Sequence, residues 1–552
     1  MPYLQTGDTF GGIIEEVRLR PASGVSILLL AVFSIWLPSS VAMAEDGSHP
    51  ISLREVLALA VEQNPDIRAA GIDVEQAGQA IRIADGTFDT YLTSRLQYDR
   101  ATRRDFVSQG MLSLFEFFDP SASEGGQNEV FAQQGVNLRI AASKLFSTGT
   151  RATLSLLHGW DEYETTIVRS EEIAPGSFDY DLRRGFRSSW TTDLRLTLTQ
   201  SLLSGFGFDA NLASVRAAEV YRDETKILEE NQVSRVLARV ARAYWDLFLA
   251  KRELEIRRSS LQLAKEQDRV SRLNVGAGRL PELAIFQTAN AVAAREEAVV
   301  LAEAGKADAV ARLTVLLDLP PSEPLVPTDV PTPDFAVADP ARATEQALKR
   351  NAQLLASRKD LTRREQLLVA ARDRTLPELD VFGSLGSTAY ATLGDSDDPD
   401  AENYGNSWSE LFDEDGLNYS IGLVFTYPLG NEAAEGDLER RLLDRKKARL
   451  RVKQLEDSLV SQVEAAARYV DTNRKRIEVT REALKYAEKR LTAEQALFDT
   501  GRATTRDILE AQDVLERARQ SEARAKVDLV KSRITLQDLT GGLLGELGVR
   551  VR

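Results

Sequence analysis

The chain has 552 residues, of which 28% are charged and 43% are hydrophobic, so it is apolar enough to fold. It has no cysteine and only two histidines, which excludes disulfides, thiolate metal sites and cysteine nucleophiles, and argues against a histidine cluster. The net charge of −15 argues against nucleic acid as a partner. We therefore expect no catalytic residue, no metal and no cofactor.

The first 44 residues have the pattern of an export signal. Arg18 and Arg20 precede an apolar run at 25–44, which is broken by Pro38 and ends in Ala-Met-Ala, a small-x-small cleavage pattern. A single membrane anchor is the alternative, but the run is short for a spanning helix. Residues 1–44 are therefore predicted to be a signal peptide. Because no later apolar run is long enough for a spanning helix, membrane insertion would require strands closed into a barrel.

The rest of the chain is dominated by long helical patterns. The longest, at 211–275, has about 65 residues and would extend roughly 98 Å, about three times the thickness of a bilayer core. Its apolar residues are spaced as in a packed helical seam. Two shorter helices have about the summed length of one long helix, so we expect them to stack end to end beside it. The helices are expected at 52–86, 211–275 and 281–317, and again at 344–375, 437–498 and 504–539.

Short alternating segments precede the long helices. In DLRLTLTQ, Leu194, Leu196 and Leu198 share one face, while Arg195 lies on the other. The segment YSIGLVFTY alternates in the same way. One apolar and one polar face fits a sheet between lipid and a wet lumen, and fits equally a sandwich sheet of a soluble protein.

The order helix, strand, strand, long helix, glycine turn, helix occurs twice, which indicates an internal repeat. Asn64 aligns with Asn351, and Gly278-Arg279 aligns with Gly501-Arg502. A proline-rich stretch between the halves cannot continue a helix and is predicted to be a linker. The predicted boundaries are 45–318 for the first repeat, 319–340 for the linker, 341–540 for the second repeat and 541–552 for a C-terminal tail. The helical tips are expected near 276–281 and 499–504.

A long insert at 100–188 separates the first two strands. It contains a hairpin pattern around Thr148-Gly149. The insert is either an enlarged extracellular loop or added length in the barrel strands, and we favour the loop. Trp190 and Trp408 lie near strand ends and are candidates for an interfacial aromatic belt. With four strands per chain, one chain cannot close a barrel, whereas three chains supply about 12 strands.

Several segments, taken in this duplicated order, resemble the TolC-like outer-membrane factor family. They are ISLREVLALAVEQNPDIRAA, FDTYLTSRLQY, LTLTQSLLSGFG, VARAYWDLFLA and FDTGRATTRDILEAQ, and the resemblance covers nearly all of the mature chain. It implies a mostly α protein with a β-barrel part. Three chains would form a 12-stranded outer-membrane barrel, about four strands each, continued by a long periplasmic α-helical coiled-coil tunnel.

The resemblance also implies a function and partners. It predicts the outer-membrane exit duct of a tripartite efflux or type I secretion system in a Gram-negative bacterium, extending into the periplasm. The expected partners are two further copies of the chain in a homotrimer, a periplasmic adaptor (membrane fusion) protein, an inner-membrane transporter and outer-membrane lipid. The alternative is a periplasmic adaptor or structural coiled-coil protein without a pore. An adaptor has one helical hairpin flanked by compact β domains, and the two hairpins of this chain favour the duct.

The stretch LFDTGRATTRDILEAQD, at 497–513, is predicted to be the tip of a helical hairpin. Gly501 would supply the positive φ that ends one helix, and Thr504, with Asp507 three residues on, would cap the next. In the first copy, Pro281 is expected as the first residue of its helix.

Asp507 and Glu510 are the candidate gate. They lie three residues apart on one helical face, and in a trimer with that face inward they form a ring of about six carboxylates that attracts cations. By resemblance they match the acidic pair at the family's tunnel constriction. In the alternative interpretation, Asp507 only caps the helix and Glu510 only complements its dipole.

Other tip residues follow from the resemblance. Arg502 and Arg506 are possible partners in ion pairs that close the mouth, although Phe498 replaces the tyrosine that braces such links in the family. Tyr244 and Trp245 are predicted to be core residues rather than ligand-binding ones. The expected adaptor-docking positions are Gly278, Arg279 and Leu280 at one tip, and Gly501, Arg502 and Ala503 at the other. An enzyme is disfavoured because no nucleophile–base pair or glycine-rich phosphate loop accompanies the acids.

Overall fold

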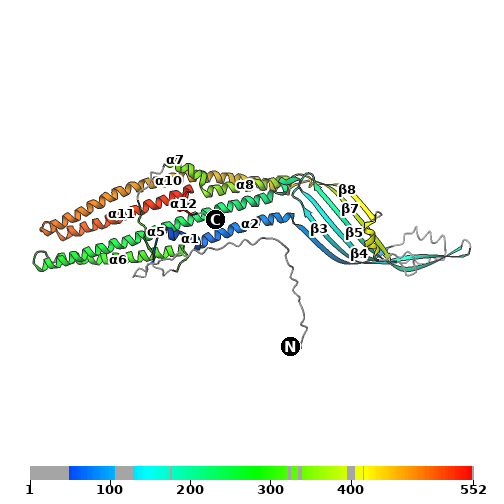
Figure 1. Ribbon diagram of the computed structural model, residues 1–552, viewed down its shortest axis with the longest axis horizontal. Helices are drawn as coiled ribbons and strands as arrows, with labels where there is room; N and C mark the ends of the chain where they lie inside the picture. Colours follow the sequence, from blue (N-terminus) through cyan, green and yellow to red (C-terminus); the bar gives the residue numbers. More distant parts are fainter. Residues whose placement is uncertain are drawn as a thin grey trace, which may run out of the picture. The chain divides into compact units, whose positions relative to one another are not determined.

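The computed structural model describes one unit of the chain, drawn in colour in Figure 1. The predicted signal peptide, residues 1–44, lies outside the described residues. Within the described part, no helix combines the length and apolar character needed to cross a bilayer. The described residues are 49–105, 129–174, 177–320, 325–332, 339–393, 404–413 and 416–549.

Two long antiparallel helical hairpins form the helical part (Figure 1). One consists of α5 (Ala213–Gly276) and α6 (Leu283–Leu316), and the other of α10 (Glu432–Asp499) and α11 (Thr505–Thr540). Shorter helices continue alongside each long one, as predicted. They are α1 (Leu53–Gln63) and α2 (Pro65–Asp85), which pack on α5, and α7 (Pro340–Arg350) and α8 (Ala352–Asp373), which pack on α10.

The predicted single helices at 52–86 and 344–375 are wrong, because each is broken at an asparagine. The side-chain Oδ1 of Asn64 accepts the backbone N–H of Asp66 at 2.9 Å, and Pro65 begins the next helix. Asn351 Oδ1 likewise accepts the backbone N–H of Leu354 at 3.0 Å. Such side-chain bonds satisfy backbone donors that a helix start leaves free, so they stabilise the break.

The two asparagines also fasten the breaks to the neighbouring hairpins. Asn64 Nδ2 donates to the carbonyl oxygen of Leu316 at 2.8 Å, at the end of α6. Asn351 Nδ2 donates to the carbonyl oxygen of Leu539 at 3.0 Å, near the end of α11. The two breaks therefore have equivalent partners in the two halves of the chain.

Residues 325–332, the described middle part of the predicted proline-rich linker, pack against the helical part. The strand β6 (Leu325–Pro327) pairs in parallel with β1 (His49–Ile51). The fully buried Tyr244 donates its hydroxyl proton to Asp329 Oδ2 at 2.7 Å and accepts the backbone N–H of Asp329 at 3.1 Å. Burial raises the pKa of Tyr244 to about 12. The phenol therefore stays neutral and fixes the linker to α5.

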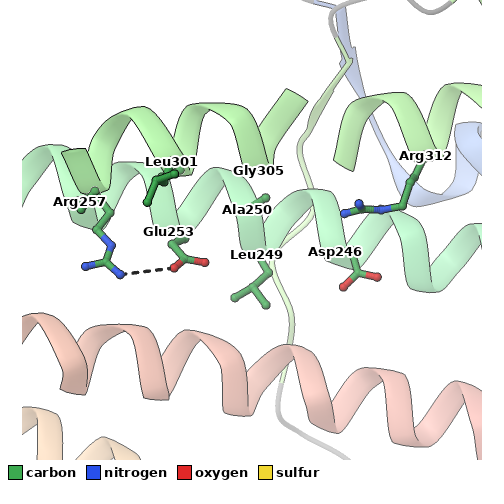
Figure 2. Close-up of a pocket in the computed structure, with 10 residues that line it drawn as sticks. Asp246, Leu249, Ala250, Glu253, Arg257, Leu301, Gly305 and Arg312 are labelled. Carbon is green, nitrogen blue, oxygen red and sulfur yellow. Dashed lines mark ion pairs between the residues drawn. The ribbon is translucent and has the colours of Figure 1, made fainter. Parts of the chain in front are cut away.

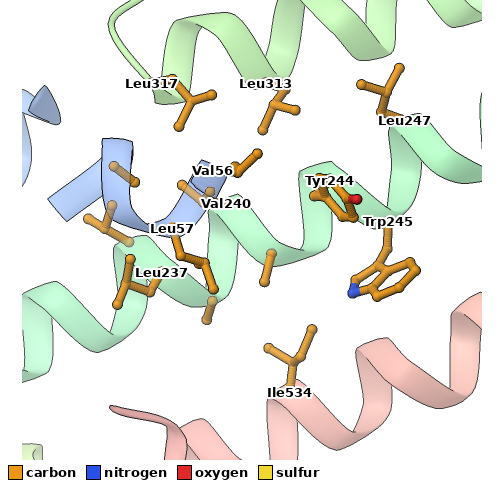
Figure 3. Packing of buried hydrophobic residues seen from close by; sticks show 14 of the residues in the cluster. Val56, Leu57, Leu237, Val240, Tyr244, Trp245, Leu247, Leu313, Leu317 and Ile534 are labelled. Carbon is orange, nitrogen blue, oxygen red and sulfur yellow. The ribbon is translucent and has the colours of Figure 1, made fainter. Parts of the chain in front are cut away.

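The largest apolar core surrounds this part of α5 (Figure 3). Tyr244 and Trp245 both belong to it, which confirms their prediction as core residues. Leu543, from the short helix α12 (Leu543–Glu546), also packs there, so part of the predicted tail at 541–552 is folded. A second core joins α7, α8, α10 and α11, and a third, smaller one joins α10 and α11 nearer their tip.

At one end of the helices lies a six-stranded antiparallel sheet with the strand order β2-β3-β4-β5-β7-β8 (Figure 1). The prediction of four strands per chain is therefore wrong. The insert at 100–188 contributes two extra strands, β3 and β4, instead of only the extracellular loop we favoured. The strands are β2 (Thr90–Asp105), β3 (Glu129–Leu145), β4 (Thr150–Ala174), β5 (Ser177–Ser201), β7 (Glu378–Leu393) and β8 (Leu417–Thr426).

The register confirms the predicted alternation of faces. Leu196 lies opposite both Leu154 and Leu385, so these leucines share one face of the sheet. Arg195 lies on the other face, opposite Ser155 and Gly386. The leucine side chains are 41–53% exposed, so the apolar face is uncovered over this region.

The two tryptophans proposed for an aromatic belt lie together near the end of the sheet. Trp408 is in α9 (Asn406–Ser409), which packs against β5 and β7. The ring of His158 stacks on Trp190 at a centroid distance of 5.2 Å and lies 4.7 Å from Trp408. Trp408 Nε1 also donates to the Tyr404 hydroxyl at 3.1 Å. The belt itself stays a prediction.

Candidate functional site: the hairpin tips and the contacts behind them

Both hairpin tips turn at the predicted glycines. Gly278 has φ +69° and Gly501 has φ +78°, a backbone region that favours glycine. At the second tip, the N–H of Arg502 donates to the carbonyl oxygen of Leu497 at 2.8 Å, a Schellman-type ending. The first tip differs from the prediction, because α6 begins at Leu283 and Pro281 lies just before it.

Asp507 caps α11, as predicted. Its Oδ2 accepts the backbone N–H of Thr504 at 2.8 Å and the Thr504 hydroxyl at 2.7 Å. The N–H of Asp507 points back to Thr504 Oγ1, which completes a capping box. The backbone N–H of Thr504 holds the pKa of Asp507 below its usual value. Within one chain, this carboxylate therefore stabilises the first turn of its own helix.

Glu510 has an ion-pair partner that the sequence did not indicate. Its Oε1 lies 3.0 Å from Arg490 Nη2, on the neighbouring helix α10 of the same hairpin. Both side chains are about half exposed. The predicted partners Arg502 and Arg506 form no ion pair with another residue of the described chain. Within one chain, Glu510 therefore links the two helices of its own hairpin.

Two further acids, Asp513 and Glu516, join the hairpins to each other. Asp513 Oδ1 lies 2.7 Å from Arg295 Nη2 on α6, and only 8% of the Arg295 side chain is exposed. Glu516 forms an ion pair with Arg257 on α5 and accepts a hydrogen bond from Ser260. Sequence reasoning missed both contacts, because their partners lie more than 200 residues away.

The four acids nevertheless share a spacing that could have drawn attention to them. Asp507, Glu510, Asp513 and Glu516 follow one another at intervals of three residues. A step of three residues in an α-helix falls about 60° short of a full turn, so the series winds slowly around α11. Accordingly, Glu510 contacts α10, Asp513 contacts α6 and Glu516 contacts α5.

The contact between the hairpins continues away from the tip. Lys531 forms an ion pair with Asp246, and Ser234 donates to Asp538 at 2.8 Å. Of the described ion pairs between the two hairpins, the one made by Asp513 lies closest to the α11 tip. It therefore joins α11 to α6 near the tip.

An open pocket of about 300 Å³ lies between α5 and α6 beside these contacts (Figure 2). Its wall carries charges of both signs, including Asp246 and Arg312. Arg257 lies there with its Nη2 3.8 Å from Glu253 Oε1, while its Nη1 reaches Glu516. Arg257 thus bridges an acid of its own helix and an acid of the other hairpin, so the pocket wall is part of the inter-hairpin contact.

Comparison with known proteins places this architecture. Residues 343–542, which contain most of α7 and all of α8, β7, β8 and the second hairpin, match the family described as outer membrane efflux protein. Over these residues the chain is similar to outer membrane efflux proteins. The outer membrane efflux protein BepC of Brucella suis biovar 1 (strain 1330) is 24% identical over 387 residues, covering 67% of this chain and 78% of BepC.

Solved structures support the same fold. The outer-membrane channel OprN superposes with a TM-score of 0.62 at 15% identity, covering 89% of this chain and 90% of that one. The CmeC outer membrane channel of Campylobacter jejuni gives 0.58 at 16% identity, covering 89% and 85%. The fold of this chain is accordingly that of these outer-membrane channels.

Proposed function

We propose that this protein is the outer-membrane exit duct of a tripartite efflux or type I secretion system. It passively conducts substrates from a pump assembly to the exterior. The observation that carries this proposal is one chain in which two long helical hairpins lead into an antiparallel sheet with one apolar face and one polar face. A non-pore adaptor would not need an exposed apolar face on its sheet.

Three copies of the chain would close the duct. The sheets join into a barrel in the outer membrane, and the paired helices line up as a periplasmic tunnel. The equivalent bonds of Asn64 and Asn351 support a chain built from two repeats that contribute alike to this tunnel.

The tip of α11 is the proposed gate. Asp507 and Glu510 of three copies would form a carboxylate ring that attracts cations. In the structure both acids also hold the tip together, through the cap at Thr504 and the ion pair with Arg490. The Arg295–Asp513 ion pair behind the ring restrains α11 against α6. Opening the mouth would therefore require this inter-hairpin pair to break.

The exposed turns are the proposed adaptor-docking positions. Gly278, Arg279 and Leu280 form one tip, and Gly501, Arg502 and Ala503 form the other. A Cβ added at Gly278 or Gly501 would meet no atom within 4 Å, so both turns are open to a partner. A periplasmic adaptor would bind them and connect the duct to an inner-membrane transporter.

Single-channel recording of the mature oligomer in a planar bilayer tests the proposal. The duct predicts a small, cation-selective conductance, and Asp507→Ala/Glu510→Ala should enlarge it or reduce its selectivity. Glu345→Ala is the matched control, because Glu345 is an exposed acid whose ion pair with Lys349 stays within α7. A pore that the double substitution leaves unchanged would reduce the two acids to structural residues. A folded oligomer without conductance would favour the adaptor or scaffold function.

A further inference from the structure

The extra hairpin formed by β3 and β4 is continuous with the sheet. Its turn at Thr148-Gly149 lies at the helical end, because Gly207 N donates to the carbonyl oxygen of Thr148 at 3.0 Å. A Cβ at Gly149 would come within 2.1 Å of the carbonyl oxygen of Gly205, so the two turns are in close contact. The hairpin therefore turns beside the start of the long helix rather than beyond the opposite edge of the sheet.

The extra strands also keep the alternation of the strands around them. One row of directly paired residues crosses all six strands and is apolar throughout. The next row on the opposite face is small or polar. The apolar row is Leu92, Ala142, Leu154, Leu196, Leu385 and Tyr419, and the next is Thr93, Ala141, Ser155, Arg195, Gly386 and Asn418. A single barrel wall between lipid and water requires the apolar side chains of all its strands to lie on the same face.

The two edges of this sheet fit each other. Each strand runs antiparallel to its neighbours, so with six strands the outermost ones, β2 and β8, run in opposite directions. Neither β2 nor β8 has a second partner strand among the described residues. A β8 edge placed beside the β2 edge of another copy would therefore continue the antiparallel order and bury the unpaired backbone groups of both edges.

We propose that β2 of one copy pairs with β8 of the next, and that the trimeric duct has a barrel of 18 strands, six from each chain. This inference rests on the proposed duct function and gives its outer-membrane wall a specific size. The partner at each edge is another copy of this chain, because only an antiparallel edge whose apolar row continues Leu92 on one side and Tyr419 on the other matches both faces.

The strand number sets the width of the exit. With strands about 4.8 Å apart and tilted by about 40°, a barrel of 12 strands is about 24 Å across between backbones, and one of 18 strands is about 36 Å. The β3–β4 hairpin would thus widen the exit about 1.5-fold while the helical tunnel keeps its own dimensions. The wider barrel suits bulky cargo or several molecules leaving at once.

Electron cryomicroscopy of the wild-type mature trimer in lipid nanodiscs tests the strand number directly. The expected result is 18 strands with β3 and β4 in the wall. A barrel of any other strand number overturns the inference. Conductance of the same preparation tests the proposed duct function separately from the strand number. A conducting trimer with 12 strands would leave the duct function intact, whereas a folded oligomer without a pore would remove the function itself.

Disulfide trapping provides an independent measurement, because the natural chain has no cysteine. Thr93→Cys with Ala141→Cys should form a bond within one chain, since these residues are direct partners on β2 and β3. Thr93→Cys with Arg195→Cys should not, because β3 and β4 lie between β2 and β5. The reverse pattern would mean that the hairpin is outside the wall.

The contact between copies is trapped in the same way. Thr93→Cys combined in turn with Asn418→Cys, Ser420→Cys, Val424→Cys and Thr426→Cys scans the register between β2 and the neighbouring β8. These β8 residues lie on the same face of the sheet as Thr93, and tilted strands in a closed barrel pair with a stagger. At least one combination should give covalent dimers and trimers on a denaturing gel. Absence of such products from all combinations, with the intrachain Thr93–Ala141 control oxidised, would contradict the proposed edge pairing.

Discussion

Removing the charge of Asp513 should loosen the proposed gate. Asp513→Asn keeps the shape of the side chain but deprives Arg295, whose side chain is only 8% exposed, of its carboxylate. Asp513 itself is 58% exposed, so the pair lies between a surface pair, worth about 0.2–1 kcal/mol, and a buried one, whose breakage costs about 3–5 kcal/mol. We estimate about 1–2 kcal/mol for each copy.

This magnitude predicts a large change in opening. A difference of about 1–2 kcal/mol changes an equilibrium about 5- to 30-fold, and three copies that open together would multiply the effect. In single-channel recordings, Asp513→Asn should therefore give longer or larger openings than wild type. Glu345→Gln, which removes an acid from an exposed pair within α7, should not.

A charge swap makes the reasoning refutable. Arg295→Asp/Asp513→Arg should restore closure relative to either single substitution, because it rebuilds the ion pair in reverse. If Asp513→Asn assembles as a trimer but opens like wild type, or if the swap is no better than the single changes, the pair does not hold the mouth closed.

Three further outcomes concern stability. Gly501→Ala should destabilise the tip by about 1–2 kcal/mol, because φ at this residue is +78° and the added methyl group gains no contact. The change should be seen as faster proteolysis at the tip. The control Gly436→Ala, inside α10 and equally free of contacts, should not speed proteolysis. Tyr244→Phe should cost about 2 kcal/mol in urea unfolding by removing bonds to the linker, whereas the exposed Tyr486→Phe should be neutral. The lowered pKa of Asp507 means that its cap is fully formed above the ordinary aspartate pKa and is lost as pH falls through the lower folded value. Protection of the amides in the first turn of α11 against hydrogen exchange, relative to the intrinsic exchange rate at each pH, should fall over that range. Unchanged protection would contradict the cap.

The local signals in the sequence determined the helices and their turns. Gly501 ended its helix with positive φ because a residue without a Cβ adopts that conformation at little cost, and Thr504 with Asp507 formed the capping box that their spacing predicted. The period-two pattern likewise placed Leu196 and Arg195 on opposite faces. These features depend on residues that are close together in the chain.

Tertiary structure decided what depends on distant residues. The hairpin pattern at Thr148-Gly149 was legible in the sequence, but its place inside the sheet depends on pairing with β2 and β5. Arg295 and Asp513 looked like ordinary surface charges until packing of the hairpins brought them within 2.7 Å of each other. The chain by itself therefore specified the elements and their faces. Only the packing of distant segments fixed how many strands share the sheet and which charges join the hairpins.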